Sequence, residues 1–184
     1  MKLVNIFTEG IDRKHEYGCV MLYFDFPEID AIHELIEPND VYHDDNDDSF
    51  GLEKKPHTTL LYGLHEEVPT EDVEDVLSNF TYGNCTINNA SLFEGNPKYD
   101  VLKFDVSGPS LHETNHLLRE FPHTNNFPNY HPHLTIGYIK SGEGKKYTEK
   151  FNGLQFKLSP KYAVYSKTNG DEDLIKINVN WYLF

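Results

Sequence analysis

Two short segments of the chain repeat the same pattern of residues. Pro56-His57-Thr58-Thr59 opens the run PHTTLLYG, and Pro132-His133-Leu134-Thr135 opens the run PHLTIGYI. Each run has the composition of a β-strand, with a histidine and a threonine two residues apart. Because side chains alternate along a strand, this spacing places the two side chains on one face. Two such strands facing each other would surround one small polar space with two imidazoles and two hydroxyls.

These groups suit in-line displacement at a phosphodiester whose ribose carries a free 2′-hydroxyl. One histidine, with an ordinary pKa of about 6.5, can take the 2′-hydroxyl proton while the other protonates the leaving 5′-oxygen. The acid and the base must lie on opposite sides of the phosphorus, which two strands achieve and one strand does not. The threonine hydroxyls can donate hydrogen bonds to the non-bridging oxygens. This chemistry needs no metal. A single His-x-Thr is a weak signal, but two copies with the same preceding proline are hard to attribute to accident.

The rest of the chain predicts an α+β fold. The two histidines are 76 residues apart, and each motif strand stands in a comparable place relative to a helix. This favours two related lobes, each supplying one motif strand. Thr70 and Ser110 are predicted as helix N-caps, and the glycine-containing segment 141–146 is predicted as a loop. Strands are expected over 17–26, 57–64, 84–93, 99–106, 133–140, 155–165 and 174–184, and helices over 27–36, 70–80 and 110–121.

Composition limits the class of protein and of partner. The 184 residues are 38% hydrophobic and 14% aromatic, enough for a folded core of one domain or two fused halves. The net charge of −14 repels polyanions over a Debye length of about 8 Å, so long nucleic acid is not an expected partner, whereas a small nucleotide is compatible. The N-terminus MKLVNIFTEG does not fit a signal peptide, and no run approaches the roughly 20 apolar residues of a membrane span. We expect a cytoplasmic protein in which Cys19 and Cys85 are buried free thiols.

A possible zinc motif competes with the paired histidines. The segment 112–116 reads His-Glu-Thr-Asn-His on a predicted helix, the H-E-x-x-H spacing of zinc hydrolases. His112 and His116 lie off the apolar face of that helix, and no third ligand follows at a familiar spacing. We expect no bound metal, and a zinc hydrolase remains an alternative.

Three other segments imitate functional sites. The acidic run 44–48 has the charge of a calcium loop, but Ser49 replaces the turn glycine and Lys55 the bidentate glutamate. His123 follows a proline, yet Asn125 occupies the position of the threonine. His131 should share the face of His133, where it could tune or orient the cleft or only cap its rim, without a catalytic role.

The paired motifs resemble those of the 2H phosphoesterase superfamily, and the resemblance extends from Tyr17 to the last strand. It implies a bilobal α+β fold, with two pseudo-symmetric lobes whose antiparallel sheets flank a central cleft and whose helices lie outside. Residues 1–184 would form this single domain. The resemblance further implies that His57 and His133 are the acid and base, that Thr59 and Thr135 hold phosphate, and that no cofactor is used.

The stretches YGCVMLYFDFPEID and GLEKKPHTTLLYGL look most similar to bacteriophage members of that superfamily. Some of these are anti-CBASS enzymes that degrade cyclic oligonucleotide signals of the host. The resemblance therefore implies hydrolysis of 3′–5′ bonds in a small cyclic oligonucleotide, in the host cytoplasm. The alternatives are an RNA 2′,3′-cyclic phosphodiesterase or 2′–5′ RNA ligase-like enzyme, and a sponge that binds cyclic nucleotides without cleaving them.

Several side chains are candidates for contacts to such a substrate. Tyr17, Tyr62, Tyr138 and Trp181 could stack on bases, although aromatic residues in strands are more often part of a core. Lys145, on the glycine-containing loop after the second motif, could close over a phosphate. The alternative for Lys145 is a solvated loop tip.

Overall fold

Two four-stranded antiparallel sheets make up most of the computed structural model, which describes residues 15–47, 49–125, 127 and 129–180. The first sheet has the order β2 (His57–Leu64), β1 (Gly18–Phe24), β8 (Pro160–Ser166), β9 (Glu172–Ile175). The second has the order β6 (His133–Lys140), β5 (Tyr99–Ser107), β4 (Cys85–Phe93), β7 (Phe156–Leu158). A short parallel pair joins β3 (Thr81–Tyr82) to β10 (Asn178–Val179). The mixed α+β architecture predicted from the sequence is confirmed.

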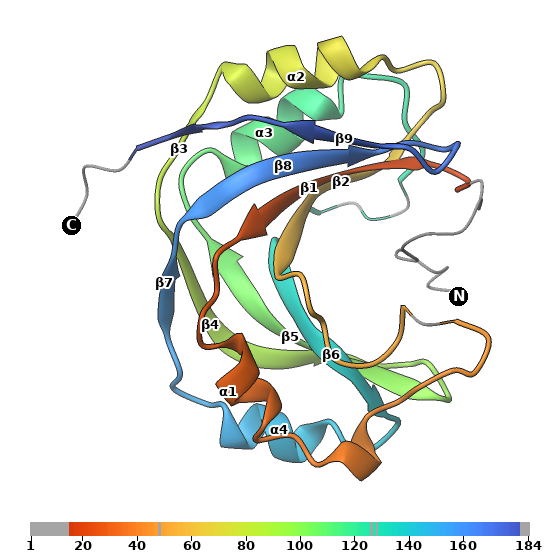
Figure 1. The fold of residues 1–184 in the computed structure, drawn as a ribbon, viewed down its shortest axis with the longest axis vertical. Coiled ribbons are helices and arrows are strands. Elements are labelled where there is room, and N and C mark those ends of the chain that lie inside the picture. Colours follow the sequence, from red (N-terminus) through yellow and green to blue (C-terminus); the bar gives the residue numbers. More distant parts are fainter. Residues whose placement is uncertain (1–14, 48, 126, 128, 181–184) are drawn as a thin grey trace.

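Both motif strands are edge strands. β2 and β6 end their sheets, and the two strands contact each other, so the two sheets meet along their motif strands (Figure 1). The predicted boundaries 57–64 and 133–140 are confirmed at both ends. Placing the motif strands at neighbouring edges brings residues distant in sequence to one site.

The helices lie outside the sheets and are exchanged between the lobes. α1 (Ile29–His33) follows β1 of the first sheet but lies beside α4 (Lys145–Lys150) at the second sheet (Figure 1). α3 (Leu111–Leu118) follows β5 of the second sheet but packs with α2 (Thr70–Ser78) at the first. Each lobe therefore depends on a helix that the other half of the chain supplies.

The connections after α1 and α3 cover the exposed edges of the motif strands, which would otherwise present unpaired backbone groups. Tyr138 N–H in β6 donates to Gly51 O at 2.8 Å, and Tyr42 N–H donates to Tyr138 O at 2.9 Å. Along β2, Thr124 N–H donates to Gly63 O at 2.8 Å. The connection after α1 begins with a 3₁₀ turn, Pro38–Asp40. The edges of both motif strands are thus covered by chain from the other half.

One continuous core runs through both lobes. Its fully buried side chains include Val20 and Leu60 of the first sheet and Phe104 and Ile136 of the second. A smaller cluster of Cys19, Met21 and Val164 lies apart from it. Cys19 and Cys85 are buried and free, as expected. No helix in the described part of the chain is long and apolar enough to span a membrane.

Four local predictions are wrong in whole or in part. Thr70 is the first residue of α2, not its N-cap, and its hydroxyl donates to Asp173 instead. Ser110 occupies the N-cap position of α3, as predicted, and its carbonyl accepts from Thr114 N–H at 2.9 Å, but its hydroxyl donates to Thr81 O at 3.2 Å and makes no side-chain cap. The predicted loop 141–146 overlaps the first turn of α4, in which Tyr147 is buried. The predicted strand 155–165 is divided into β7 and β8.

Candidate active site

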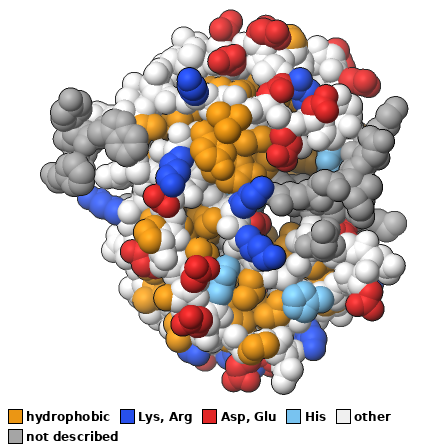
Figure 2. Space-filling model, in the orientation of Figure 1, with side chains coloured by type: hydrophobic (Ala, Val, Ile, Leu, Met, Phe, Trp, Pro, Cys, Tyr) orange, Lys and Arg blue, Asp and Glu red, His pale blue; other side chains and the backbone are white. Residues whose placement is uncertain are grey.

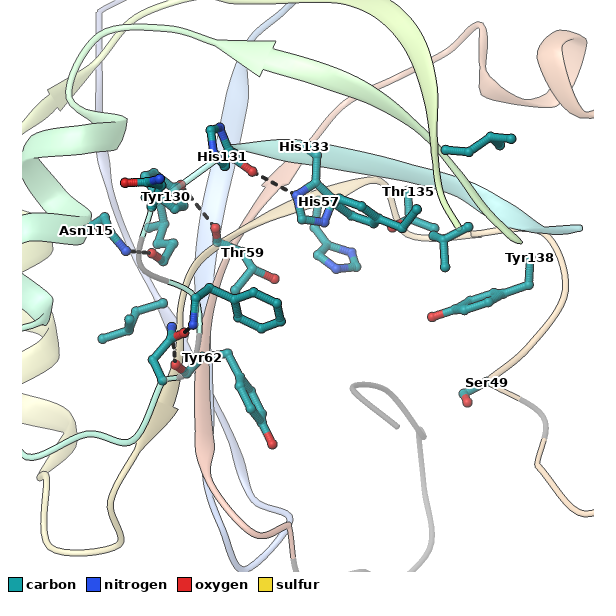
Figure 3. Close-up of a pocket in the computed structure, with 18 of the residues that line it drawn as sticks. Ser49, His57, Thr59, Tyr62, Asn115, Tyr130, His131, His133, Thr135 and Tyr138 are labelled. Carbon is teal, nitrogen blue, oxygen red and sulfur yellow. Dashed lines mark hydrogen bonds between the residues drawn. The ribbon is translucent and has the colours of Figure 1, made fainter. Parts of the chain in front are cut away.

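The two His-x-Thr pairs line one cavity of about 430 Å³ between the lobes (Figure 3). His57 and Thr59 reach it from β2, and His133 and Thr135 reach it from β6. The structure therefore brings together the four residues that the sequence singled out as candidate catalytic groups.

A β-bulge in each motif strand adds a tyrosine to this set. Opposite Val20 and Met21 the partners in β2 are Leu61 and Thr59, so Leu60 is an extra residue. In β6 the partners are Gly137 and Thr135, which leaves Ile136 extra. In a regular strand, a residue five positions after a histidine would point to the opposite face. The extra residue of the bulge shifts the alternation of side chains by one position. Tyr62 and Tyr138 therefore lie on the same face as the histidines and point into the cavity (Figure 3).

Both histidines are held in one tautomer by the same local contact. His57 Nδ1 lies 2.8 Å from Lys55 O, and His133 Nδ1 lies 2.9 Å from His131 O. A carbonyl only accepts, so each Nδ1 carries the proton, and in the neutral ring the lone pair is on Nε2. His123 makes the same contact with Phe121 O at 2.9 Å but lies outside the cavity lining. The contact therefore occurs at all three of these Pro-His dipeptides, and by itself it does not identify a functional residue.

The two histidines have different neighbours. His57 is only 6% exposed, and its ring centroid lies 5.2 Å from that of Tyr23. His133 meets the ring of Phe93 edge-on at 4.9 Å. Burial lowers the pKa of His133, the His131 carbonyl opposes this, and the nearby Lys103 ammonium lowers the pKa further. His57 acts on His133 in the same direction as Lys103, and Asp105 weakly opposes them.

Lys103 is a candidate site residue that the sequence analysis missed. It is 7% exposed, pairs in register with Thr135, and its Nζ donates to Ser91 Oγ at 2.8 Å and to Asp105 Oδ1 at 3.0 Å. The Nζ also lies 4.7 Å from the centre of the Phe93 ring. The detectable signal was a lysine within the apolar run of β5, since buried lysines are rare without partners.

The hydroxyl of Thr59 has a neighbour inside the first lobe. It hydrogen-bonds the thiol of Cys19, while burial raises the pKa of that thiol to about 12. Cys19 is therefore protonated near neutral pH and is a poor nucleophile.

The predicted base-stacking residues have different outcomes. Tyr62 and Tyr138 line the cavity, whereas Tyr17 does not and instead stacks on His65 with ring centroids 5.9 Å apart. Lys145 is exposed at the start of α4, away from the cavity lining. Trp181 lies outside the described residues. The aromatic lining residues that the sequence analysis missed are Phe50, Phe93, Tyr99, Phe127 and Tyr130.

The cavity does not share the acidity of the whole chain. Among its described lining residues, apart from the histidines, the charged side chains are Glu94 and Arg119. Figure 2 shows hydrophobic side chains near the centre of one face, bordered by Lys or Arg side chains, with many acidic side chains toward the outline. The net charge of −14 therefore does not exclude a small anion from the cavity.

The H-E-x-x-H segment forms α3 but serves other contacts. The ring of His112 packs against Tyr130 with centroids 5.2 Å apart, and Asn115 Nδ2 donates to Leu60 O at 2.6 Å. Within the described residues, no group of three or more His, Cys, Asp or Glu could hold a metal ion.

The acidic run 44–48 and His131 were the other segments that resembled functional sites. In the acidic run, Asp44 Oδ1 accepts from Asn46 N–H at 3.1 Å, and Asp47 Oδ1 accepts from Ser49 N–H at 3.1 Å. These are turn contacts within the loop. His131 lines the cavity, as predicted from its spacing to His133.

No protein-family model and no curated protein matches the chain. Among solved structures, Kluyveromyces marxianus Usb1 with uridine monophosphate is similar, with a TM-score of 0.56 and 10% identity over 89% of this chain and 99% of that chain. The MHV ns2 PDE domain gives a TM-score of 0.46 and 17% identity over 88% and 99% of the two chains. A protein described as a phosphoesterase gives 0.46 and 12% over 87% and 95%. The fold of this chain is the 2H phosphoesterase-like α+β fold that the paired motifs predicted.

Proposed function

We propose that the protein is a metal-independent phosphodiesterase of the 2H type. One observation carries the proposal: two His-x-Thr pairs reach one cavity from two edge strands, with both imidazoles held in the same tautomer. An acid, a base and hydroxyl donors for a phosphate are then all supplied by side chains.

The reaction follows from these groups. The Nε2 atom of one histidine removes the proton of the ribose 2′-hydroxyl, and the 2′-oxygen attacks the phosphorus. The bond to the 5′-oxygen breaks, and the second histidine gives that oxygen a proton. Thr59 and Thr135 donate hydrogen bonds to the non-bridging oxygens as negative charge develops on them. The product ends are a 2′,3′-cyclic phosphate and a free 5′-hydroxyl.

We propose a small cyclic oligonucleotide with 3′–5′ bonds as the substrate, which would make the protein an antagonist of host CBASS signalling. A cavity of about 430 Å³ suits a nucleotide-sized ligand. Tyr62 and Tyr138 enter it from opposite lobes, so a base on each side of the phosphate has an aromatic partner. The similar Usb1 structure contains uridine monophosphate. The alternative substrate is a 2′,3′-cyclic phosphate at an RNA end.

Single-turnover cleavage of cyclic dinucleotides and trinucleotides in EDTA tests this proposal. The wild type should open the ring, and His57→Ala and His133→Ala should each lose at least about 100-fold in rate. RNA with a 2′,3′-cyclic end, assayed in parallel, separates the two substrate classes. His123→Ala is the matched control, because it removes a similar Pro-His side chain outside the cavity.

Three results would contradict the proposal. Undiminished cleavage in both active-site variants would exclude the histidine mechanism. Loss of activity in EDTA, restored by zinc, would favour the hydrolase built on α3. Tight binding with the ligand recovered intact would favour the sponge.

A further inference from the structure

The extra residue of each bulge has its carbonyl bound by a helix side chain. Leu60 O accepts from Asn115 Nδ2 at 2.6 Å, and Asn115 is 6% exposed. Ile136 O accepts from His33 Nε2 at 3.1 Å and also from Glu53 N–H at 2.9 Å. A bulge disrupts the ladder at its extra residue, and a buried carbonyl requires a donor. Asn115 therefore supplies a donor to the carbonyl of the extra residue in β2, and His33 adds a second donor to that of the extra residue in β6.

The two contacts are reciprocal. Asn115 lies on α3, which follows a strand of the second sheet, yet it binds β2 of the first. His33 lies on α1, which follows a strand of the first sheet, yet it binds β6 of the second. The two donors are 82 residues apart in the sequence, close to the 76 that separate the catalytic candidates. Each half of the chain thus holds the bulge of the other half.

Each bulge determines where a tyrosine points. With the extra residue in place, Tyr62 and Tyr138 share the cavity with the histidines and threonines; a regular strand would turn them to the opposite face. We propose that Asn115 and His33 are positioning residues, which hold these bulges and so aim Tyr62 and Tyr138 at the ligand. The inference rests on the proposed function only in taking the cavity as the ligand site.

A ligand-free measurement tests the positioning directly. In Asn115→Leu, which keeps the size of the side chain but removes the donor, cross-strand NOEs should show loss of the Val20–Leu61 and Met21–Thr59 register or departure of the Tyr62 ring from the cavity. Tyr130→Phe is the matched control, because it removes a donor to the neighbouring Thr59 carbonyl at 3.0 Å, a position outside the bulge. An unchanged register and an unchanged Tyr62 ring in Asn115→Leu would overturn the proposal for the first lobe.

The second lobe offers a variant with less risk to folding. His33 is only partly buried, and Glu53 N–H remains as a second donor to Ile136 O. His33→Leu should shift the Tyr138 ring, and His33→Asn, which retains a donor, should restore it. Equal ring positions in the wild type and His33→Leu would overturn the proposal for this lobe.

A double-mutant cycle with substrate measures whether Asn115 affects KM through Tyr62. With a cyclic dinucleotide, Asn115→Leu should raise KM roughly tenfold while kcat changes less. In a Tyr62→Ala background the same substitution should have little further effect on KM, because the residue acts through Tyr62. Fully additive losses would contradict the proposal. If the protein cleaves no cyclic dinucleotide, the proposed substrate fails, while the NOE result still decides the positioning role.

Discussion

The two lobes place the same motif on the same backbone frame but surround it with different chemistry. In the first lobe, Tyr23 stands opposite His57 and Met21 opposite Thr59. In the second, Asp105 stands opposite His133 and Lys103 opposite Thr135. Cross-strand neighbours share a face of the sheet, so an aromatic and apolar wall adjoins one histidine and an ion pair adjoins the other.

The comparison distinguishes a contact that both histidines share from an electrostatic environment that only His133 has. The backbone contact to Nδ1 is the same on both sides, so the common feature is a fixed tautomer. The ammonium of Lys103 adjoins only the second lobe, where it helps to lower the pKa of His133. An acid and a base must be in opposite protonation states when they act, and the surroundings of His133 favour its neutral form.

The largest expected effect comes from removing either histidine. Because the proposed acid and base would act in one step, His57→Ala and His133→Ala should each reduce kcat by about 10²–10⁴, and the double variant should be little worse than either single one. Single-turnover rates at saturating substrate measure this. A double variant whose losses multiply would show that the two lobes act independently.

Removing the hydroxyls should have the next largest effect. Thr59→Val and Thr135→Val keep the shape of the side chain but delete a donor to the phosphate, so we expect a loss of roughly tenfold to 100-fold in kcat/KM for each. Thermal unfolding of both variants serves as the control for folding. A large loss for only one variant would mean that the phosphate lies against one lobe.

Lys103→Met makes the second lobe resemble the first. Removing the ammonium and leaving Asp105 without this partner should raise the pKa of His133, since positive charge disfavours the imidazolium and negative charge favours it. NMR titration of the His133 ring measures the shift, and the ring of His123, outside the cavity, is the internal control. A fall in the pKa of His133 would contradict the prediction. If His133 is the base, the acidic limb of the rate profile should move to higher pH.

The smallest expected effect is on stability in mild acid. Burial lowers the pKa of both His33 and His133 in the folded protein, so the unfolded chain binds protons more readily. The free energy of unfolding should therefore fall as the pH drops below about 6.5, the ordinary pKa of histidine. Urea unfolding at pH 7.5 and 5.5 measures this, with His33→Asn and His133→Asn expected to show a weaker decrease. A decrease equal to that of the wild type would assign the effect to other groups.

The motif strands and their four polar residues could be predicted from the sequence because they depend on local alternation. His57 and Thr59, like His133 and Thr135, needed only a strand with a period of two to share a face. Strict alternation would place Tyr62 and Tyr138 on the opposite face, because each lies five residues, an odd number, after its histidine. That prediction is wrong, because each strand contains a bulge. Tyr62 and Tyr138 were singled out as aromatic residues, without a reason for their direction.

Only the tertiary structure decided which other groups join the site. The bulges at Leu60 and Ile136 exist through pairing with β1 and β5 and through donors on helices far away in sequence. Lys103 comes to lie near His133 because β5 lies beside β6, and strand order cannot be read from local periodicity. The sequence alone determined the candidate catalytic groups, since residues near each of them in the chain set its strand and its direction. The fold decided their surroundings, since those depend on contacts between the two exchanged halves.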